Sequence, residues 1–236
     1  MRVYFFPKWL IQAVLILLCG LLAAGAVWMF LGGQDASVMA DPVYQGTSTE
    51  QKVALAINVD WGEDVVPSML DTLAKENASA TFFVTGRFAE KFPELVQQIA
   101  AAGHEIGDHG YKHPHPDELS CEQNQKDIMQ AEEILEKLTG TKPVLYAPPY
   151  GEHGKTCLEA AESCGYTTIL WTMDTIDWEK PAPTHETLVA RAAGDKLASG
   201  AIILMHPKEH TAEALADIIG AIRAKGYSCV KVSDVL

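Results

Sequence analysis

The sequence predicts an α/β protein built on a parallel sheet, and in particular a closed (β/α) barrel of about seven units. Short apolar runs typical of buried strands alternate with longer segments of helical periodicity over just under 200 residues. Polar or aromatic residues follow most of these runs, where the active sites of such barrels collect. An uncharged stretch near the start predicts one transmembrane helix ahead of the barrel.

Local signals set the bounds of the expected elements. Ser120 and Gln123 form a capping box at the start of the longest helix, and Gly140 ends that helix. Pro67 fits the first turn of another helix, and Gly103 fits the end of a third. The expected strands are 53–59, 79–85, 104–109, 143–149, 167–173, 200–206 and 228–236. The expected helices are 66–76, 92–103, 120–140, 154–165, 185–197 and 211–226.

The uncharged stretch, residues 9–31, is long enough to cross a bilayer. At roughly 1.5 Å per residue a helix of this length reaches about 34 Å, against a hydrocarbon core of about 30 Å. Arg2 and Lys8 precede it, and the next positive charge is Lys52. This asymmetry predicts a cytoplasmic N-terminus.

Three regions follow from this pattern: a cytoplasmic tip and anchor at 1–32, a linker at 33–51 and a catalytic domain at 52–236. We expect a single-pass protein of the cell membrane with the domain on the extracytoplasmic side. Secretion after cleavage of a signal peptide near Ala40 is the alternative.

The charge of the chain limits its partners. The formal net charge is −13, and residues 1–40 contribute +1, so residues 41–236 carry −14. An acidic domain argues against nucleic acid, whose phosphates need positive partners. A neutral glycan or a cationic amino sugar remains compatible with this charge. The five scattered cysteines predict no disulfide framework.

The residues after each strand suggest a site. Individually they are weak signals, because an aspartate after a strand is commonly a helix N-cap. Two histidines four residues apart can bind a metal through their ring nitrogens. The five stretches, in chain order, are NVDWG at 58–62, HGYKH at 109–113, APPY at 147–150, DTIDW at 174–178 and LMH at 204–206.

Residues 53–236 resemble the NodB-homology polysaccharide deacetylases, carbohydrate esterase family 4, whose five motifs run in this order. The resemblance implies an irregular, NodB-like (β/α) barrel. It also implies hydrolysis of N-acetyl groups on a cell-wall amino-sugar polymer, peptidoglycan or chitin-like, by metal-activated water. The alternatives are a catalytically impaired glycan-binding protein on the same scaffold and an amidohydrolase of a small acylated molecule. The implied partners are a glycan polymer and, through the N-terminal helix, a membrane.

The same resemblance implies roles for individual residues. His109 and His113 match the two metal-binding histidines, and Asp60 matches the general base. The implied cofactor is a divalent metal, zinc in the first place, with cobalt or nickel as alternatives. His206 matches the acid that protonates the leaving amine, and Asp177 supports it.

Substrate contacts are implied for the remaining motif residues. The backbone N–H of Tyr150 would face the oxyanion. The side chains of Tyr150, Trp178 and Pro149 would contact the sugar.

Two positions depart from the family pattern. Trp61 stands where a second, metal-binding aspartate is expected, and Ala147 stands in place of an arginine that orients the base. Asp60 could itself turn onto the metal. Glu63 and Asp64 are either charges near a helix N-terminus or substitute ligands. Because the other motifs are intact, we expect a rearranged but active site.

Overall fold

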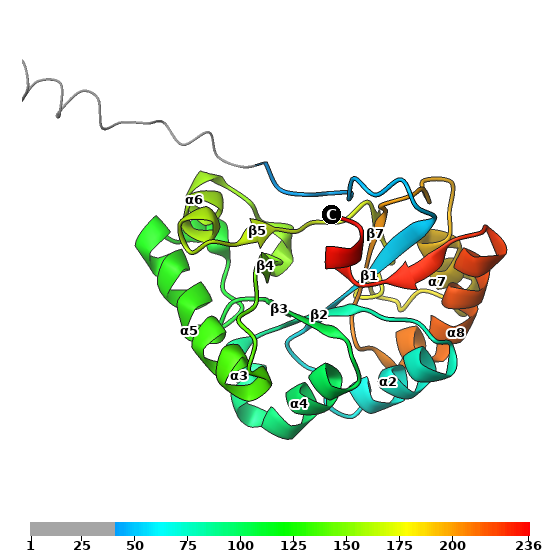
Figure 1. Cartoon of the computed structure of the whole chain (residues 1–236), viewed down its shortest axis with the longest axis horizontal. Coiled ribbons are helices and arrows are strands. Elements are labelled where there is room, and N and C mark those ends of the chain that lie inside the picture. Colours follow the sequence, from blue (N-terminus) through cyan, green and yellow to red (C-terminus); the bar gives the residue numbers. More distant parts are fainter. Residues whose placement is uncertain (1–40) are drawn as a thin grey trace, which may run out of the picture. The chain divides into compact units, whose positions relative to one another are not determined.

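A computed structural model of the chain describes residues 41–236 as a curved parallel sheet with helices around its outer side (Figure 1). Within these residues no helix is long and apolar enough to cross a bilayer. The predicted anchor and tip, residues 1–32, lie outside the described residues, as does the first part of the predicted linker.

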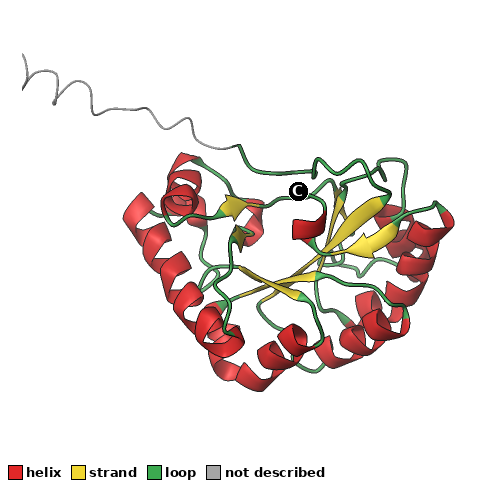
Figure 2. Ribbon diagram, viewed as in Figure 1, coloured by secondary structure: helices red, strands yellow, loops and turns green. Residues whose placement is uncertain are grey.

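Strands and helices alternate along the chain (Figure 2). The strands are β1 Lys52–Val59, β2 Thr81–Val84, β3 Glu105–Asp108, β4 Leu145–Tyr146, β5 Thr167–Thr168, β6 Met173–Asp174, β7 Ile202–Met205 and β8 Ser228–Val230. The α-helices are α2 Val66–Lys75, α3 Gly86–Lys91, α4 Pro93–Ala101, α5 Cys121–Thr139, α6 Lys155–Ser163, α7 His185–Ala192 and α8 Glu209–Ala224. Three short 3₁₀ turns are η1 Pro116–Glu118, η2 Pro149–Gly151 and η3 Val232–Asp234.

The central strand of the sheet is β1. The strand order is β5-β4-β3-β2-β1-β7-β6, and all named strand pairs are parallel. The eighth strand, β8, pairs with the first residues of β1, on the side where β2 pairs with its last residues. The predicted βα alternation is therefore confirmed.

The sequence-based expectation was wrong in three details. The barrel is not closed, because β5 and β6 lie at opposite ends of the strand order. The single strand expected at 167–173 is two short strands, β5 and β6, which pair at opposite ends of the sheet with β4 and β7. The short helix α3 was not expected; it begins where the Thr85 side chain accepts a hydrogen bond from Phe88 N.

The period-two pattern of β1 explains where the core and the cavity lie. Its odd-numbered residues, 53 to 59, pack against the helices. Its even-numbered residues Ala54 and Ala56 face the inside of the curve, where Val232 and Val235 of the C-terminal turn are fully buried. The next inward residue is Asn58, which stands above this filled layer.

The end of the predicted linker is attached to the domain. Val43 pairs with Ile169 near β5, and the Gly46 N–H donates to the Gly200 carbonyl before β7 (2.8 Å). The Ser48 N–H donates to the Val235 carbonyl at the C-terminus (3.0 Å). These contacts connect two strands that the sheet itself does not pair.

We expect Gly46→Ala to lower the free energy of unfolding of the domain by roughly 1–3 kcal/mol, as overpacking does elsewhere. A Cβ at this position would overlap the Val235 carbonyl. Gly220→Ala is the matched control: it lies in α8 with open space around it, and we expect a gain of about 0.5–1 kcal/mol. Urea unfolding measures both variants. A neutral Gly46→Ala would mean that this segment does not pack on the domain.

Candidate functional site

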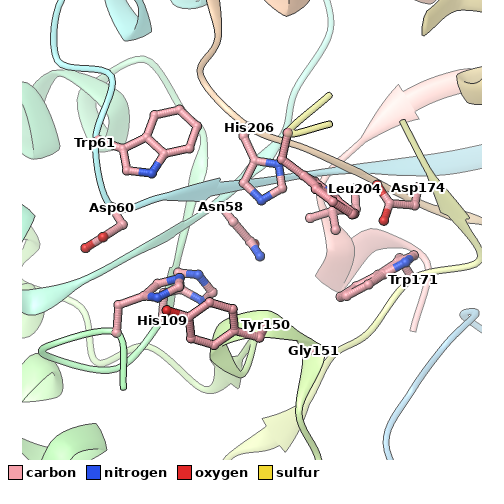
Figure 3. Close-up of a pocket in the computed structure, with 12 residues that line it drawn as sticks. Asn58, Asp60, Trp61, His109, Tyr150, Gly151, Trp171, Asp174, Leu204 and His206 are labelled. Carbon is pink, nitrogen blue, oxygen red and sulfur yellow. The ribbon is translucent and has the colours of Figure 1, made fainter. Parts of the chain in front are cut away.

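The main pocket lies at the carboxyl ends of the strands and encloses about 420 Å³ (Figure 3). This volume lies within the range of small-ligand sites. Its walls come from β1, β6 and β7 with the residues that follow each of them, and from the loops after β3, β4 and β5. The lining residues are Asn58, Asp60, Trp61, His109, His113, Tyr150, Gly151, Trp171, Asp174, Trp178, Leu204 and His206.

His109 is held as a neutral ring on the pocket wall. It is buried, and its Nδ1–H donates to the Ala147 carbonyl (2.6 Å), which leaves Nε2 free to accept. Burial, together with the nearby His113, lowers the pKa of His109 to about 3. Burial also lowers the pKa of His113, whose ring lies edge-on to His109 with centroids 4.9 Å apart. Two neutral imidazoles side by side can bind a metal ion.

The loop that carries both histidines is fixed by a helix. Asp127 of α5 accepts hydrogen bonds from the backbone N–H groups of Tyr111 (2.8 Å) and Lys112 (3.2 Å). His113 adopts a left-handed backbone conformation (φ 57°). Such conformations in non-glycine residues concentrate at functional sites.

Asp60 is bound by an arginine from a neighbouring element. Arg87 of α3 donates from Nε to Asp60 Oδ1 (2.6 Å) and from Nη2 to Asp60 Oδ2, so the ion pair is bidentate. Thr85 donates a third hydrogen bond to Oδ1 (2.8 Å). Bidentate pairs of this kind fix orientation as well as charge. Arg87 therefore contacts the carboxylate that the absent arginine at position 147 was expected to orient.

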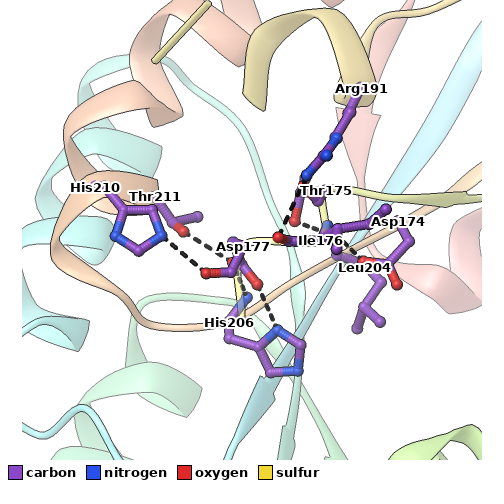
Figure 4. Close-up of polar contacts among 9 residues, drawn as sticks. All are labelled: Asp174, Thr175, Ile176, Asp177, Arg191, Leu204, His206, His210 and Thr211. Atoms are coloured by element: carbon purple, nitrogen blue, oxygen red, sulfur yellow. Dashed lines mark hydrogen bonds and ion pairs between the residues drawn. The ribbon is translucent and has the colours of Figure 1, made fainter. Parts of the chain in front are cut away.

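His206 lines the pocket and is hydrogen-bonded from behind by the buried Asp177 (Figure 4). Asp177 Oδ1 accepts from His206 Nδ1 (2.7 Å), and Oδ2 accepts from His206 N (2.7 Å) and from the Thr211 hydroxyl (2.8 Å). Burial alone would raise the pKa of Asp177, but the hydrogen bonds and charge of His206 outweigh it and hold that pKa below its usual range. The pair fixes the imidazole, whose Nε2 remains available to the pocket.

The loop that presents Asp177 has a strained backbone. Ile176 has a φ of 50°, which is rare for a β-branched residue. Asp174 Oδ1 accepts a hydrogen bond from the Ile176 N–H (2.7 Å), and Arg191 donates to the carbonyls of Thr175 (3.1 Å) and Ile176 (3.4 Å). These contacts hold the strained turn in place (Figure 4).

Tyr150 forms part of the pocket rim. Its backbone is left-handed (φ 60°) and its ring lies flat on His115, with centroids 3.9 Å apart. His115 in turn bonds Glu152 (2.7 Å), which raises the pKa of His115. The side chains of Tyr150 and Trp178 remain more than half exposed, so both can receive a ligand from solvent.

Trp61 lies beside His206. Its ring stacks on His206 (centroids 6.0 Å apart, 21° between planes), and Lys208 Nζ lies 4.1 Å from the Trp61 centroid. Figure 3 shows it across the pocket from His109. Within residues 41–236 no group of three or more His, Cys, Asp or Glu side chains could hold a metal. The two donors that lie side by side in this pocket are His109 and His113, while Asp60 is bound to Arg87.

Most of the predicted site residues meet in this pocket: Asp60, Trp61, His109, His113, Tyr150, Trp178 and His206. Asp177 lies behind His206, and Pro149 is adjacent to the lining without belonging to it. The two loop acids are outside the pocket, since Glu63 lies 3.8 Å from Lys91 and Asp64 is exposed. Neither is placed to substitute for a ligand.

Three residues of the site were given no role from the sequence: Arg87, Trp171 and Asn58, although Asn58 begins the stretch NVDWG. Asn58 could have been found from its inward, period-two position at the end of β1. Arg87 follows the second strand and could have been included for that reason. Trp171 had no signal, because the sequence placed it inside a strand.

Comparisons with known proteins agree on one family. Residues 45–169 match the family model described as polysaccharide deacetylase. The chain is 35% identical over 199 residues to a peptidoglycan-N-acetylglucosamine deacetylase of Bacillus cereus, covering 81% of this chain and 71% of the relative. It is 38% identical over 200 residues to the uncharacterized protein YlxY of Bacillus subtilis, covering 85% of this chain and 62% of that relative's length.

The structural comparison points the same way and adds one contrast. A crystal structure of a pseudoenzyme of the CE4 family from Bacillus anthracis superimposes with a TM-score of 0.78 at 33% identity. The match covers 83% of this chain and 68% of that one. The proteins to which this chain is similar therefore include one described as a pseudoenzyme and one named as a deacetylase.

We expect Trp61→Asp to tighten zinc binding at pH 7 by at least about tenfold, because it adds the missing carboxylate next to two neutral imidazoles. Isothermal titration calorimetry measures the affinity. Trp61→Ala is the control, since it removes the same ring but adds no donor, and it should bind zinc as weakly as the wild type. Equal affinities of the two variants would contradict the two-donor description.

We expect the stability difference between wild type and Asp177→Asn to be full above about pH 4 and to shrink as the pH falls further. The folded-state pKa of Asp177 is lowered, so its ionised form stabilises the fold above the unfolded-state pKa, and this contribution is lost as pH falls through the lowered pKa. Thermal unfolding between pH 6 and pH 2 measures it. The exposed Asp217–His185 pair supplies the control, Asp217→Asn, which should change stability little. A difference independent of pH would contradict the assignment.

Proposed function

Because the chain belongs to the polysaccharide deacetylase family, we propose that it hydrolyses acetamido groups on a cell-wall amino-sugar polymer of the peptidoglycan or chitin-like class. One observation carries this proposal: Asp60 and the Asp177-supported His206 line one pocket, with exposed aromatic rings at its rim. A base, an acid and a sugar-sized opening are what hydrolysis of a glycan amide requires.

In this proposal Asp60 takes a proton from the attacking water, and Arg87 and Thr85 hold its carboxylate in one orientation. His206 then gives a proton to the departing amine while Asp177 stabilises the imidazolium. The backbone N–H of Tyr150 donates to the oxyanion, and the rings of Tyr150 and Trp178 contact the sugar. Trp61 stacked on His206 limits the positions that the acid can adopt.

A divalent ion fits this pocket only in part. His109 and His113 suit zinc, with cobalt or nickel as alternatives, but the third position is Trp61 and Asp60 is bound to Arg87. We propose that such an ion binds weakly through the two histidines. The proton transfers assigned to Asp60 and His206 do not depend on it.

We also propose that the domain works outside the cytoplasm, attached to the membrane by residues 9–31. The uncharged stretch and the position of Arg2 and Lys8 support this orientation. Polymeric cell wall is the substrate class that such a location offers.

A second candidate function is glycan binding with impaired catalysis. The tryptophan at the expected ligand position and the similarity to a pseudoenzyme favour it. Both candidates require the same pocket to receive an N-acetylated oligomer, and they differ only in turnover.

We expect the purified domain, supplied with zinc or cobalt, to release acetate from an N-acetylglucosamine oligomer or from peptidoglycan. Asp60→Asn should lower the rate at least about 100-fold, because it removes the base. Arg87→Ala should lower it less, and Arg87→Lys should recover part of the loss. Glu63→Gln, outside the pocket, is the control and should retain the rate.

The outcome separates the candidates. Oligomer binding without acetate release would favour the impaired glycan-binding protein. Turnover of a monomeric acylated sugar but not of polymer would favour a small-molecule amidohydrolase. No binding and no release would contradict both glycan functions.

A further inference from the structure

The amide of Asn58 has one end in the core and the other in the pocket. Asn58 is 6% exposed, and among the described residues its Oδ1 is the one buried side-chain nitrogen or oxygen that lacks a hydrogen bond. Figure 3 shows the nitrogen of the same carboxamide directed into the pocket, which Asn58 lines. Asn58 therefore faces a ligand as a hydrogen-bond donor, through the hydrogens on Nδ2.

The fold itself gives no reason for an amide at this position. Leaving a buried oxygen unpaired costs stability, and native proteins seldom do so without a reason. On the inward face of β1, Asn58 follows Ala56, its partner in the β2 register is Phe83, and Leu204 of β7 lies nearby. An apolar side chain of the same size would match these neighbours without an unpaired oxygen. The nitrogen that faces the pocket is the part of the side chain that can account for the amide.

The position of Nδ2 suits the carbonyl oxygen of an acetamido group. Figure 3 shows this nitrogen in the space between Asp60, His109 and His206, the residues that surround the proposed reaction. The Asp60 carboxylate and Nε2 of the neutral His109 present acceptors to that space, and the proton of His206 is assigned to the departing amine. A carbonyl oxygen needs a donor instead, and Asn58 supplies one.

We propose that Asn58 is a further catalytic residue, whose Nδ2 donates a hydrogen bond to the carbonyl oxygen of the ligand's acetamido group. The ligand identity rests on the proposed function above. When water attacks the carbonyl carbon, the oxygen gains negative charge and the hydrogen bond from Asn58 strengthens. Asparagine side chains stabilise oxyanions in this way in other hydrolases. Asn58 thus adds a second donor to the backbone N–H of Tyr150, and neither donor requires a metal ion.

A binding cycle tests the hydrogen bond without requiring turnover. The ligands are an N-acetylglucosamine tetramer and its N-thioacetyl analogue, whose sulfur is a weak acceptor in place of the carbonyl oxygen. Calorimetry gives the ratio of the two affinities for the wild type and for Asn58→Leu. The preference of the wild type for the oxygen ligand should fall at least about threefold in the variant, a coupling typical of groups in contact.

Two further measurements separate this role from a structural one. The melting temperature of Asn58→Leu without ligand should stay the same or rise, because the unpaired oxygen is gone. Where the wild type releases acetate, Asn58→Leu should lower kcat about 100-fold and change KM much less, since the donor acts mainly on the transition state. If Asn58→Leu does not fold, Asn58→Ala carries the same expectations for binding and for kcat.

Asn124→Leu is the matched control. Asn124 is also buried, but it lies outside the pocket lining and its Nδ2 donates to the Pro116 carbonyl (2.9 Å). This variant should lose stability and keep the wild-type preference for the oxygen ligand. The opposite responses of two buried asparagines distinguish a ligand contact from a structural one.

Three results would overturn the proposal. The first is an oxygen-to-sulfur preference that is the same in the wild type and in Asn58→Leu. The second is a fall in the melting temperature of Asn58→Leu like that of Asn124→Leu, which would make the amide structural. The third is a wild type that binds no N-acetylated oligomer. That third result contradicts the proposed function as well, whereas the first two leave the proposed function standing.

Discussion

The ion pair between Arg87 and Asp60 is the constraint on which the chemistry of this pocket depends. Three hydrogen bonds, two from Arg87 and one from Thr85, fix a carboxylate that is nearly buried. Thr85 also caps the helix that carries Arg87, so the start of α3 and the orientation of Asp60 depend on the same side chain. Asp60 cannot turn toward His109 and His113 without giving up these bonds. These bonds therefore favour the proposed role of Asp60 as a base over a role as a metal ligand.

The part of the pocket around Trp61 and Arg87 differs from the pattern of the family motifs. The tryptophan stands where the resemblance implies a metal-binding aspartate, and its ring packs on His206. The guanidinium reaches Asp60 from α3 rather than from the loop after β4, where Ala147 now packs inside the sheet. Trp61 and Arg87 thus each contact one of the two residues, His206 and Asp60, to which we assign proton transfer, and the proposed metal site has one donor fewer. Asn58 adds an unpaired acceptor to the same floor.

The sequence predicted the parts of the fold that local chemistry decides. The capping box at Ser120 and the left-handed Gly140 bound the longest helix as expected. Closure of the barrel was mispredicted, because it depends on long-range strand pairing and on the segment near Val43. The order of the motifs predicted the histidines, Asp60 and Asp177 as site residues. The sequence could not single out Arg87 or Asn58 as site residues. The ion pair between Arg87 and Asp60, and the unpaired oxygen of Asn58, are visible only in the three-dimensional structure.

A crystal structure of the zinc-soaked protein tests the central claim most directly. If Arg87 fixes Asp60 as a base, the carboxylate will remain on Arg87 and Thr85, and any zinc ion will contact only His109, His113 and water. The contrary result is a zinc ion bound by both histidines and by Asp60, with Arg87 released. That arrangement would make Asp60 the missing ligand and leave the pocket without the base assigned to it.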